Sequence, residues 1–292
     1  MQKTSNSIGR GRRLTRKREM SAMKNEITVG IAGLGAIGMP VARWLDDGVS
    51  GLKLVGVSAA NKERAKVRIE DFVNSPKVME LEELIDSSDV IVESLPPDCF
   101  ESLAVPTINA GKTLIVLTLT SLLNRLDLVD TAAKTGAQII AATGALVGFD
   151  AVRAAAKGKI HSVIMKTRKP PKGLKKAPFV LEQGINLDNL DEPLCLYRGS
   201  VRDAAVKFPA NVNVSVALAL AGIGPDKTRY EIWADPAMDR NTHEISVDAD
   251  STRFDMAIAG VPTEENPATG KLTPLSGMAT LERLVAPLTV GS

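Results

Sequence analysis

Cysteine and histidine are both scarce in this chain, with two residues of each among 292. Cys99 and Cys195 lie far apart, so they form neither the ligand spacing of a metal site nor a disulfide framework. Neither cysteine stands in a motif that activates a thiol. We therefore expect no metal ion and no catalytic thiol, and we expect a reducing, cytoplasmic compartment.

Long hydrophobic stretches are also absent. The longest apolar runs, such as Thr113–Leu119, have the length of a buried strand, short of the roughly 18 residues that a membrane-spanning helix needs. Hydrophobic residues make up 44% and charged residues 24% of the chain, ordinary values for a globular protein. The length suits two domains, and we expect no membrane partner.

The formal net charge of +2 hides two regions of opposite sign. Residues 1–24 carry eight Lys or Arg and one Glu, whereas the rest of the chain carries 28 basic and 33 acidic side chains. The acidic body argues against a nucleic-acid partner. We interpret residues 1–24 as a disordered basic leader or the product of an upstream start; a transit peptide or an anchor for an anionic surface stays open.

From Ile27 onward, short apolar runs alternate with segments of helical length. The expected strands are Ile27–Ala32, Leu52–Ser58, Asp89–Leu95, Thr113–Leu119 and Ala137–Ala142. The expected helices are Ala36–Asp47, Lys62–Phe72, Asp98–Ala110 and Leu122–Lys134. Nearly continuous apolar strands between helices indicate a parallel sheet covered on both faces. Residues 25–144 therefore predict an α/β domain with a doubly wound parallel sheet.

The pattern changes near residue 145. Strands are expected over Ile160–Arg168, Thr228–Ala234, Glu244–Ala249 and Arg253–Val261, with a loop at Lys169–Lys176 and a helix at Lys207–Gly222. Residues 145–270 thus predict a C-terminal α+β domain with a mainly antiparallel sheet. Apolar residues at helical spacing place a last helix within residues 271–292, which we expect to pack back on the first domain.

Three glycines follow the first expected strand directly, in the segment Gly33-Leu34-Gly35-Ala36-Ile37-Gly38. Gly33 permits a tight turn, Gly35 lets the backbone approach a pyrophosphate, and Gly38 lets the next helix lie close to the strand. The helix start at Ala36 and Ile37 offers backbone N–H groups to the phosphates. In this strand–turn–helix context the motif predicts a Rossmann domain that binds a nicotinamide dinucleotide.

An acidic residue that would bind the ribose 2′-hydroxyl is missing after the second strand, where the chain reads Ser58-Ala59-Ala60-Asn61-Lys62-Glu63-Arg64. A small neutral residue such as Asn61, with Lys62 and Arg64 nearby, tolerates or favours the extra phosphate of NADP. Both basic residues are equally compatible with a solvated helix face. The expected cofactor is therefore NAD or NADP.

The two histidines differ in their surroundings. His161 begins a strand-like run and is interpreted as a structural or edge histidine. His243 lies in a polar segment that we expect to form a turn between two strands of the second domain. From there it can face an interdomain cleft and titrate near neutrality as the proton donor or acceptor of a hydride transfer. From chemistry alone, a plain surface histidine is an equal alternative.

Several segments together resemble the L-aspartate dehydrogenase family over about residues 27–288. They are Gly33–Gly38, Ala141–Asp150, Lys166–Pro171, Phe208–Val214, Ala219–Gly224, Ala234–Pro236, Arg240–His243 and Glu265–Pro267. The resemblance implies oxidation of L-aspartate to iminoaspartate with NAD or NADP, by a homodimer. It also implies that His243 is catalytic and that Ala145 and Asn213 contact the nucleotide.

The substrate carboxylates need cationic partners, and Lys166 and Arg168 are candidates because arginine can clamp a carboxylate with two hydrogen bonds. A solvated basic strand end is an equal interpretation of this pair. Two rival functions stay open. One is another Rossmann-type reductase or dehydrogenase, and the other is a non-catalytic dinucleotide sensor, which would keep Gly33–Gly38 without needing His243.

Overall fold

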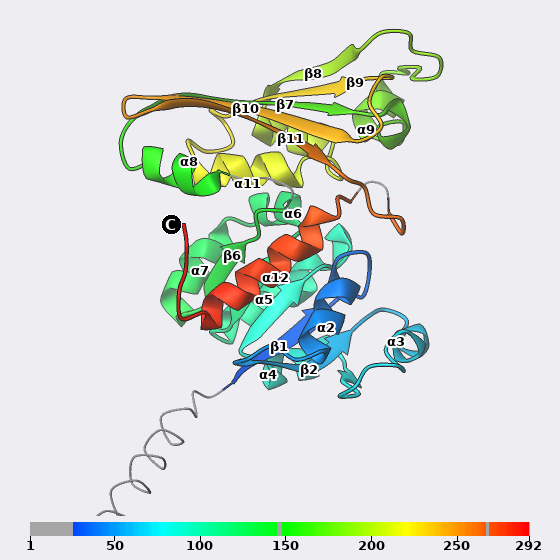
Figure 1. Ribbon diagram of the computed structural model, residues 1–292, viewed down its shortest axis with the longest axis vertical. Helices are drawn as coiled ribbons and strands as arrows, with labels where there is room; N and C mark the ends of the chain where they lie inside the picture. Colours follow the sequence, from blue (N-terminus) through cyan, green and yellow to red (C-terminus); the bar gives the residue numbers. More distant parts are fainter. Residues whose placement is uncertain (1–25, 145–147, 267–268, 292) are drawn as a thin grey trace, which may run out of the picture.

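The computed structural model describes residues 26–144, 148–266 and 269–291, which form two sheets with their helices (Figure 1). The basic leader and Ala145 lie outside the described residues. No helix in the described ranges is long and apolar enough to cross a membrane.

Six parallel strands form the first sheet, in the order β3-β2-β1-β4-β5-β6. They are β1 (Ile27–Ala32), β2 (Leu52–Ser58), β3 (Lys77–Val78), β4 (Val90–Glu93), β5 (Thr113–Val116) and β6 (Gln138–Ala141). The helices between them are α2 (Gly38–Asp46), α3 (Lys62–Arg68), α4 (Leu81–Ser87), η1 (Pro97–Cys99), α5 (Phe100–Asn109), α6 (Leu119–Leu123) and α7 (Asp127–Thr135). This strand order is that of a Rossmann domain, so the predicted doubly wound sheet is confirmed.

Burial explains why these segments form central strands. All four residues of β4 and the last four of β1 are buried, as apolar strands covered on both faces must be. Gly136 ends α7 in the left-handed conformation, with a φ of 77°, as the glycine predicts. The helix predicted over Leu122–Lys134 is instead two helices, α6 and α7, separated by a short turn.

The second sheet has five strands in the order β11-β10-β7-β9-β8. They are β7 (Ile160–Lys169), β8 (Leu194–Ser200), β9 (Arg229–Ala234), β10 (Asn241–Ala249) and β11 (Arg253–Gly260). Its helices are α8 (Phe149–Ala155), η2 (Pro171–Gly173), α9 (Pro178–Glu182), α10 (Val201–Lys207) and α11 (Asn213–Ala221). Only β7 and β9 pair in parallel, which confirms a mainly antiparallel sheet. In Figure 1, α8 and α11 lie between this sheet and the first domain, and the opposite face of the sheet is bare.

The helix predicted over Lys207–Gly222 is wrong in its first third. Helix α10 ends at Lys207, and α11 begins only at Asn213. Phe208 has φ −136° and ψ 52°, because a residue that precedes a proline avoids the helical conformation. Strand β8 was missed from the sequence altogether. The break at Phe208 matters for function, since it turns the start of α11 towards the first domain.

The C-terminal helix α12 (Leu272–Val285) packs on α2 and β2 of the first domain. Leu281 is fully buried in the core cluster that also holds Ile31 and Val41. A second core cluster runs without interruption from the first sheet to the second, for example from Ile91 to Met165. Each fully buried aliphatic side chain contributes about 1.5–3 kcal/mol of transfer free energy, so this shared core holds the two sheets together.

Candidate functional site

A groove of about 1110 Å³ follows the carboxyl ends of β1, β2 and β4. Its walls include the glycine segment Gly33–Ile37, the residues Ser58–Arg64 after β2, and Ser94–Pro96 after β4. Because β1 lies between β2 and β4, this is the point where the strand order reverses. Doubly wound sheets bind their ligands at that point, and we name this groove the dinucleotide groove.

The three glycines of the segment have different surroundings. Gly33 has a φ of +97°, and a Cβ atom there would overlap the backbone oxygen of Ser94. A Cβ atom at Gly38 would overlap the carbonyl oxygen of Gly33, whereas one at Gly35 would meet open space. The structure thus agrees with the three roles expected from the sequence: a tight turn, close helix packing, and an open approach to the backbone at Gly35.

The ribose end of the groove carries one cation without an ion pair among the described residues. Asn61 caps α3, since its Oδ1 accepts a hydrogen bond of 2.9 Å from the backbone N–H of Arg64. Lys62 forms an ion pair with Glu80 across the groove. The Arg64 side chain is exposed and lines the groove, so it is the basic group that faces the expected place of a 2′-phosphate.

A smaller pocket of about 220 Å³ lies where the two domains meet, and we name it the seam pocket. It shares Ile37 with the dinucleotide groove. The first domain contributes Leu117 and Thr143 to its wall, and the second contributes Lys169 and His243. Its volume is below the roughly 300–1,000 Å³ typical of pockets for drug-sized ligands, which suits a small substrate.

His243 is the third residue of β10, and the expectation that it lies in a turn is wrong. Its side chain is buried, and its Nδ1 lies 3.0 Å from the hydroxyl of Thr167 on β7. Burial, together with the charge of Lys169, lowers the pKa of His243 to about 3. A pKa this low keeps the imidazole neutral at physiological pH, whereas the sequence alone predicts that His243 titrates near neutrality.

Lys169 is the charged group that the sequence analysis missed, because it was assigned to a loop. It is the last residue of β7, is 5% exposed, and its Nζ donates a hydrogen bond of 3.2 Å to Asn211. Burial lowers the pKa of Lys169 to about 8. The alternation of buried residues along β7, at Val163, Met165 and Thr167, continues to Lys169 and would have indicated its orientation.

Lys166 and Arg168 lie on the opposite face of the same sheet. In the register of β7 and β10, His243 pairs with Thr167, whereas Lys166 pairs with Glu244. Neighbouring residues of a strand point to opposite faces, so Lys166 and Arg168 point away from the seam pocket, which neither of them lines. Both cations lie over the ring of Trp233. Among the basic residues of β7, only Lys169 lines the seam pocket, so the structure does not bring Lys166 and Arg168 together with His243.

Comparisons with known proteins show which family the chain belongs to. Residues 150–284 match the family model "Aspartate dehydrogenase, C-terminal", and residues 33–142 match "Homoserine dehydrogenase, NAD binding domain". The chain is 46% identical to L-aspartate dehydrogenase of Bradyrhizobium diazoefficiens, an alignment that covers 92% of this chain and 95% of the relative. The chain belongs to the L-aspartate dehydrogenase family. The resemblance inferred from the sequence is thereby confirmed.

Two further relatives of the family show how far the similarity extends. L-aspartate dehydrogenase 3 of Bordetella bronchiseptica is 45% identical, over 92% of this chain and 99% of that protein. The crystal structure of aspartate dehydrogenase from Thermotoga maritima superimposes with a TM-score of 0.70 at 22% identity, covering 91% of this chain and 99% of that one. The Thermotoga structure shows that the two-domain fold is common to the family.

Asn213 joins the two domains of this family member beside the seam pocket. It is the first residue of α11, and its Oδ1 accepts hydrogen bonds of 3.0 Å from both the backbone N–H and the hydroxyl of Thr120. The residue lines the pocket, as a nucleotide contact would. The other candidate contact, Ala145, lies outside the described residues. His161 is exposed and paired with Asp250, in keeping with a structural histidine.

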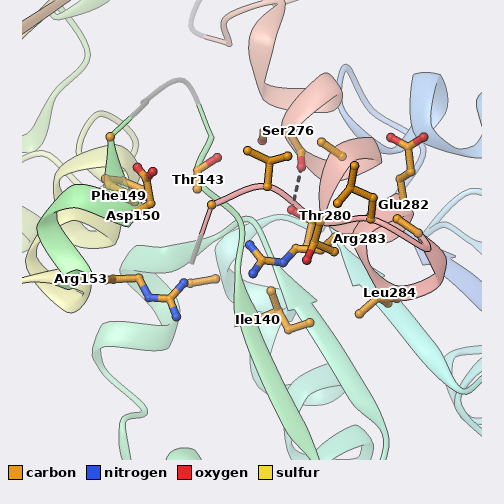
Figure 2. A pocket seen from close by; sticks show the side chains of 18 of the residues that line it. Ile140, Thr143, Phe149, Asp150, Arg153, Ser276, Thr280, Glu282, Arg283 and Leu284 are labelled. Atoms are coloured by element: carbon orange, nitrogen blue, oxygen red, sulfur yellow. Dashed lines mark hydrogen bonds between the residues drawn. The ribbon is translucent and has the colours of Figure 1, made fainter.

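Another hollow, of about 1030 Å³, lies between β6, α8 and α12 (Figure 2). Asp150, Arg153 and Arg283 line it, and it meets the seam pocket at Thr143. Its wall contains neither the glycine segment nor a histidine. Within the described ranges, no three His, Cys, Asp or Glu side chains gather as metal ligands would. The dinucleotide groove and the seam pocket therefore form the candidate site.

We predict that Gly35→Val abolishes dinucleotide binding while the fold survives. The new side chain enters the open space where the pyrophosphate approaches, so the affinity for NADH should fall by roughly 100-fold or more, about 2.7 kcal/mol. Titration calorimetry measures the affinity, and thermal unfolding checks the fold. Gly38→Val is the contrasting variant, which should unfold at lower temperature because its side chain overlaps Gly33. Unchanged NADH affinity in a folded Gly35→Val protein would contradict the assignment.

We predict that Ala60→Asp weakens NADP more than NAD. Ala60 is exposed in the groove wall close to Arg64, so a carboxylate there repels a 2′-phosphate and competes for the guanidinium. The ratio of the two dissociation constants should change about tenfold, a like-charge effect of about 1.4 kcal/mol. Equal loss for both cofactors would show that the ribose pocket lies elsewhere.

Proposed function

We propose that this protein oxidises L-aspartate to iminoaspartate with NAD or NADP bound in the dinucleotide groove. The observation that carries the proposal is the buried pair of Lys169 and His243 in one small pocket next to the glycine segment. An amino dicarboxylate needs a cation for recognition and a base for its ammonium group, and the pair supplies both. The imine then serves pyridine-nucleotide biosynthesis or hydrolyses to oxaloacetate and ammonia.

The residues of the groove suit a dinucleotide. Gly35 leaves the space that a phosphate would fill, and the nine-residue helix α2 directs its first backbone N–H groups to the same place. When bound, the oxidised nicotinamide supplies the chemistry of hydride acceptance from the substrate Cα. Ala36 and Ile37 hold the phosphates in this proposal, and Asn213 contacts the nicotinamide half. Ala145, which lies outside the described residues, stays a candidate nucleotide contact.

Lys169 is the proposed ligand of a substrate carboxylate. Its ammonium is buried and, among the described residues, it has an amide oxygen but no carboxylate as its partner. A buried charge without an opposite charge is costly, which is why burial lowers the pKa of Lys169. A substrate carboxylate would supply that opposite charge, so the pocket favours an acidic substrate over a neutral one.

His243 is the proposed proton acceptor. Because Nδ1 faces the hydroxyl of Thr167, Nε2 is the ring nitrogen left for the substrate. Besides burial, the positive charge of Lys169 lowers the pKa of the imidazole. The substrate carboxylates offset that charge, so substrate binding raises the pKa of His243. Nε2 then takes a proton from the substrate ammonium, and the freed amine lone pair forms the C=N bond as the hydride leaves Cα.

The rival functions account less well for the seam pocket. A dinucleotide sensor has no need of a buried lysine beside a buried histidine. A semialdehyde dehydrogenase needs a thiol nucleophile. Cys99 lies in the wall of the dinucleotide groove and Cys195 on the second sheet, and neither lines the seam pocket. Turnover with a panel of amino acids and both cofactors separates these functions, and aspartate should be the preferred substrate.

We further propose that the protein is a homodimer that pairs through the bare face of the second sheet. No described element covers this face, which exposes Ile164 and carries Trp233 among basic side chains (Figure 1). Glu244 on β10 and Asp255 on the edge strand β11 lie on the same face, so a two-fold axis would bring unlike charges together. Sedimentation equilibrium should report twice the 31.0 kDa of the chain.

The cytoplasmic location also remains a proposal. It rests on Cys99 and Cys195, which are free thiols in the described residues, as expected of a reducing compartment. Oxidising conditions would leave exposed Cys99 open to modification. Fractionation of cells that express the full chain, with detection of the protein in the soluble fraction, tests the location.

We predict that Lys169→Met weakens the binding of dicarboxylates. The loss of one partner of a buried charge pair costs about 2–5 kcal/mol, so the inhibition constant of succinate should rise by roughly 30-fold or more. Succinate is the suitable probe, since it has two carboxylates but no amine that titrates. The matched control is Lys166→Met on the opposite face, which should leave succinate inhibition unchanged.

The same residue sets the pH dependence of succinate binding. Lys169 is charged below its pKa of about 8 and loses its charge as the pH rises through that value. Wild-type affinity for succinate should therefore be constant below about pH 8 and fall above it, and Lys169→Met should lack this fall. A pH profile that is the same in both proteins would assign the carboxylate to another cation.

We predict that His243→Ala lowers kcat for aspartate oxidation by about 10²–10⁴-fold, the usual contribution of a general base. Affinity for NADH should stay close to wild type, since His243 lies in the seam pocket rather than in the dinucleotide groove. Steady-state kinetics and calorimetry measure the two effects. His161→Ala, which changes an exposed histidine paired with Asp250, should leave kcat unchanged. Wild-type kcat in His243→Ala would make the histidine structural.

A further inference from the structure

Glu93 is a buried carboxylate that the proposed mechanism does not use. It is the last residue of β4 and is 0% exposed. Its Oε1 accepts hydrogen bonds from the backbone N–H of Leu95 (3.0 Å) and from the hydroxyl of Thr118 (2.8 Å). Its Oε2 accepts hydrogen bonds from the backbone N–H groups of Leu117 (3.2 Å) and Thr118 (2.9 Å). Four donors thus converge on one carboxylate.

These donors come from two loops that bound the cofactor site. Leu95 lies in the wall of the dinucleotide groove, directly after β4. Leu117 lies in the wall of the seam pocket, directly after β5. Ser94, between Glu93 and Leu95, donates to the carbonyl oxygens of Ala32 and Gly33 at the glycine turn. The carboxylate therefore ties together the loops after β4 and β5, and the Ser94 hydroxyl links the first of these loops to the glycine turn.

The contacts favour an ionised carboxylate. Three of the four donors are backbone N–H groups, which can only donate, and the fourth is the hydroxyl of Thr118, which also lies 3.3 Å from the carbonyl oxygen of Leu95. Burial raises the pKa of Glu93, and the four hydrogen bonds oppose that shift by favouring the charged form. A buried charge costs stability unless its hydrogen bonds are complete, so this arrangement holds the loops in one geometry.

We infer that Glu93 is a positioning residue for the nicotinamide half of the cofactor, which it serves by fixing the Leu95 and Leu117 loops against each other. The inference rests on the proposed dinucleotide binding and does not depend on aspartate as the substrate. The adenosine half lies at the other end of the groove, beside Ser58–Arg64, which makes no hydrogen bond to Glu93. The two halves of the cofactor should therefore respond differently to a change at Glu93.

The test compares the affinities of Glu93→Gln for NADH and for ADP-ribose, which lacks the nicotinamide ring. The glutamine NH₂ group cannot accept a hydrogen bond, so at least one backbone N–H group loses its partner and the loops separate. NADH affinity should fall by about tenfold, or 1.4 kcal/mol, while ADP-ribose affinity stays within about twofold of wild type. Titration calorimetry measures both affinities, and no substrate is needed.

Asp89→Asn is the matched control. Asp89 lies just before the other end of β4, and its Oδ2 accepts hydrogen bonds from the backbone N–H (2.9 Å) and the hydroxyl (2.7 Å) of Thr28. The variant changes an exposed carboxylate anchor just before the same strand, far from the carboxyl ends that line the groove. It should lower the melting temperature and leave the ratio of NADH to ADP-ribose affinity unchanged.

Three results would overturn the inference. One is a folded Glu93→Gln protein with wild-type affinity for both ligands, and another is an equal loss for both, which would make Glu93 a general structural residue. Where Glu93→Gln does not fold, Thr118→Val is the second variant, because it removes one donor and keeps the carboxylate. It should lower the affinity for NADH by about threefold and leave the affinity for ADP-ribose unchanged. An unchanged ratio of the two affinities is the third contrary result. A wild-type protein that binds neither ligand would instead refute the dinucleotide assignment itself.

Discussion

A side chain at Gly38 would overlap the carbonyl oxygen of Gly33, so α2 can lie against the end of β1 only because that position is glycine. Ser94 completes this junction from the neighbouring strand, with its hydroxyl 3.0 Å from two carbonyl oxygens of the turn. The open space at Gly35 and the position of Ile37 in both pockets follow from the same close packing. The dinucleotide groove and the seam pocket thus share one backbone framework.

The face of the second sheet that lies against the first domain carries buried polar residues, whereas the cations Lys166 and Arg168 lie on the opposite face. Thr167, Lys169 and His243 share one face because their strands are in register, and the seam between the domains removes them from water. Burial lowers the pKa values of both the lysine and the histidine, and no negative charge among the described residues pairs with Lys169. A dicarboxylate would supply that charge, which connects substrate recognition to the basicity of His243.

Much of the fold could be predicted because its signals are local. Apolar runs located five of the six strands of the first sheet, all but the two-residue β3, and a glycine ended α7. The wrong element boundaries arose where two local sequence signals predicted different conformations for the same residues. Helical spacing over Lys207–Gly222 concealed the effect of Pro209 on Phe208, and two prolines after Lys169 made a strand residue look like part of a loop. Strand β8 depends on its pairing with β9, which the sequence of the segment does not reveal.

The sequence by itself determined the glycine turn, five strands of the doubly wound parallel sheet and the family, and it predicted His243 rather than His161 as the catalytic histidine. These features depend on the conformational range of single residues and on short-range periodicity. Only the tertiary structure decided which lysine faces the pocket, that His243 is neutral, and that Glu93 joins the loops around it. Those properties depend on strand register and on burial, which arise from contacts between residues far apart in the chain.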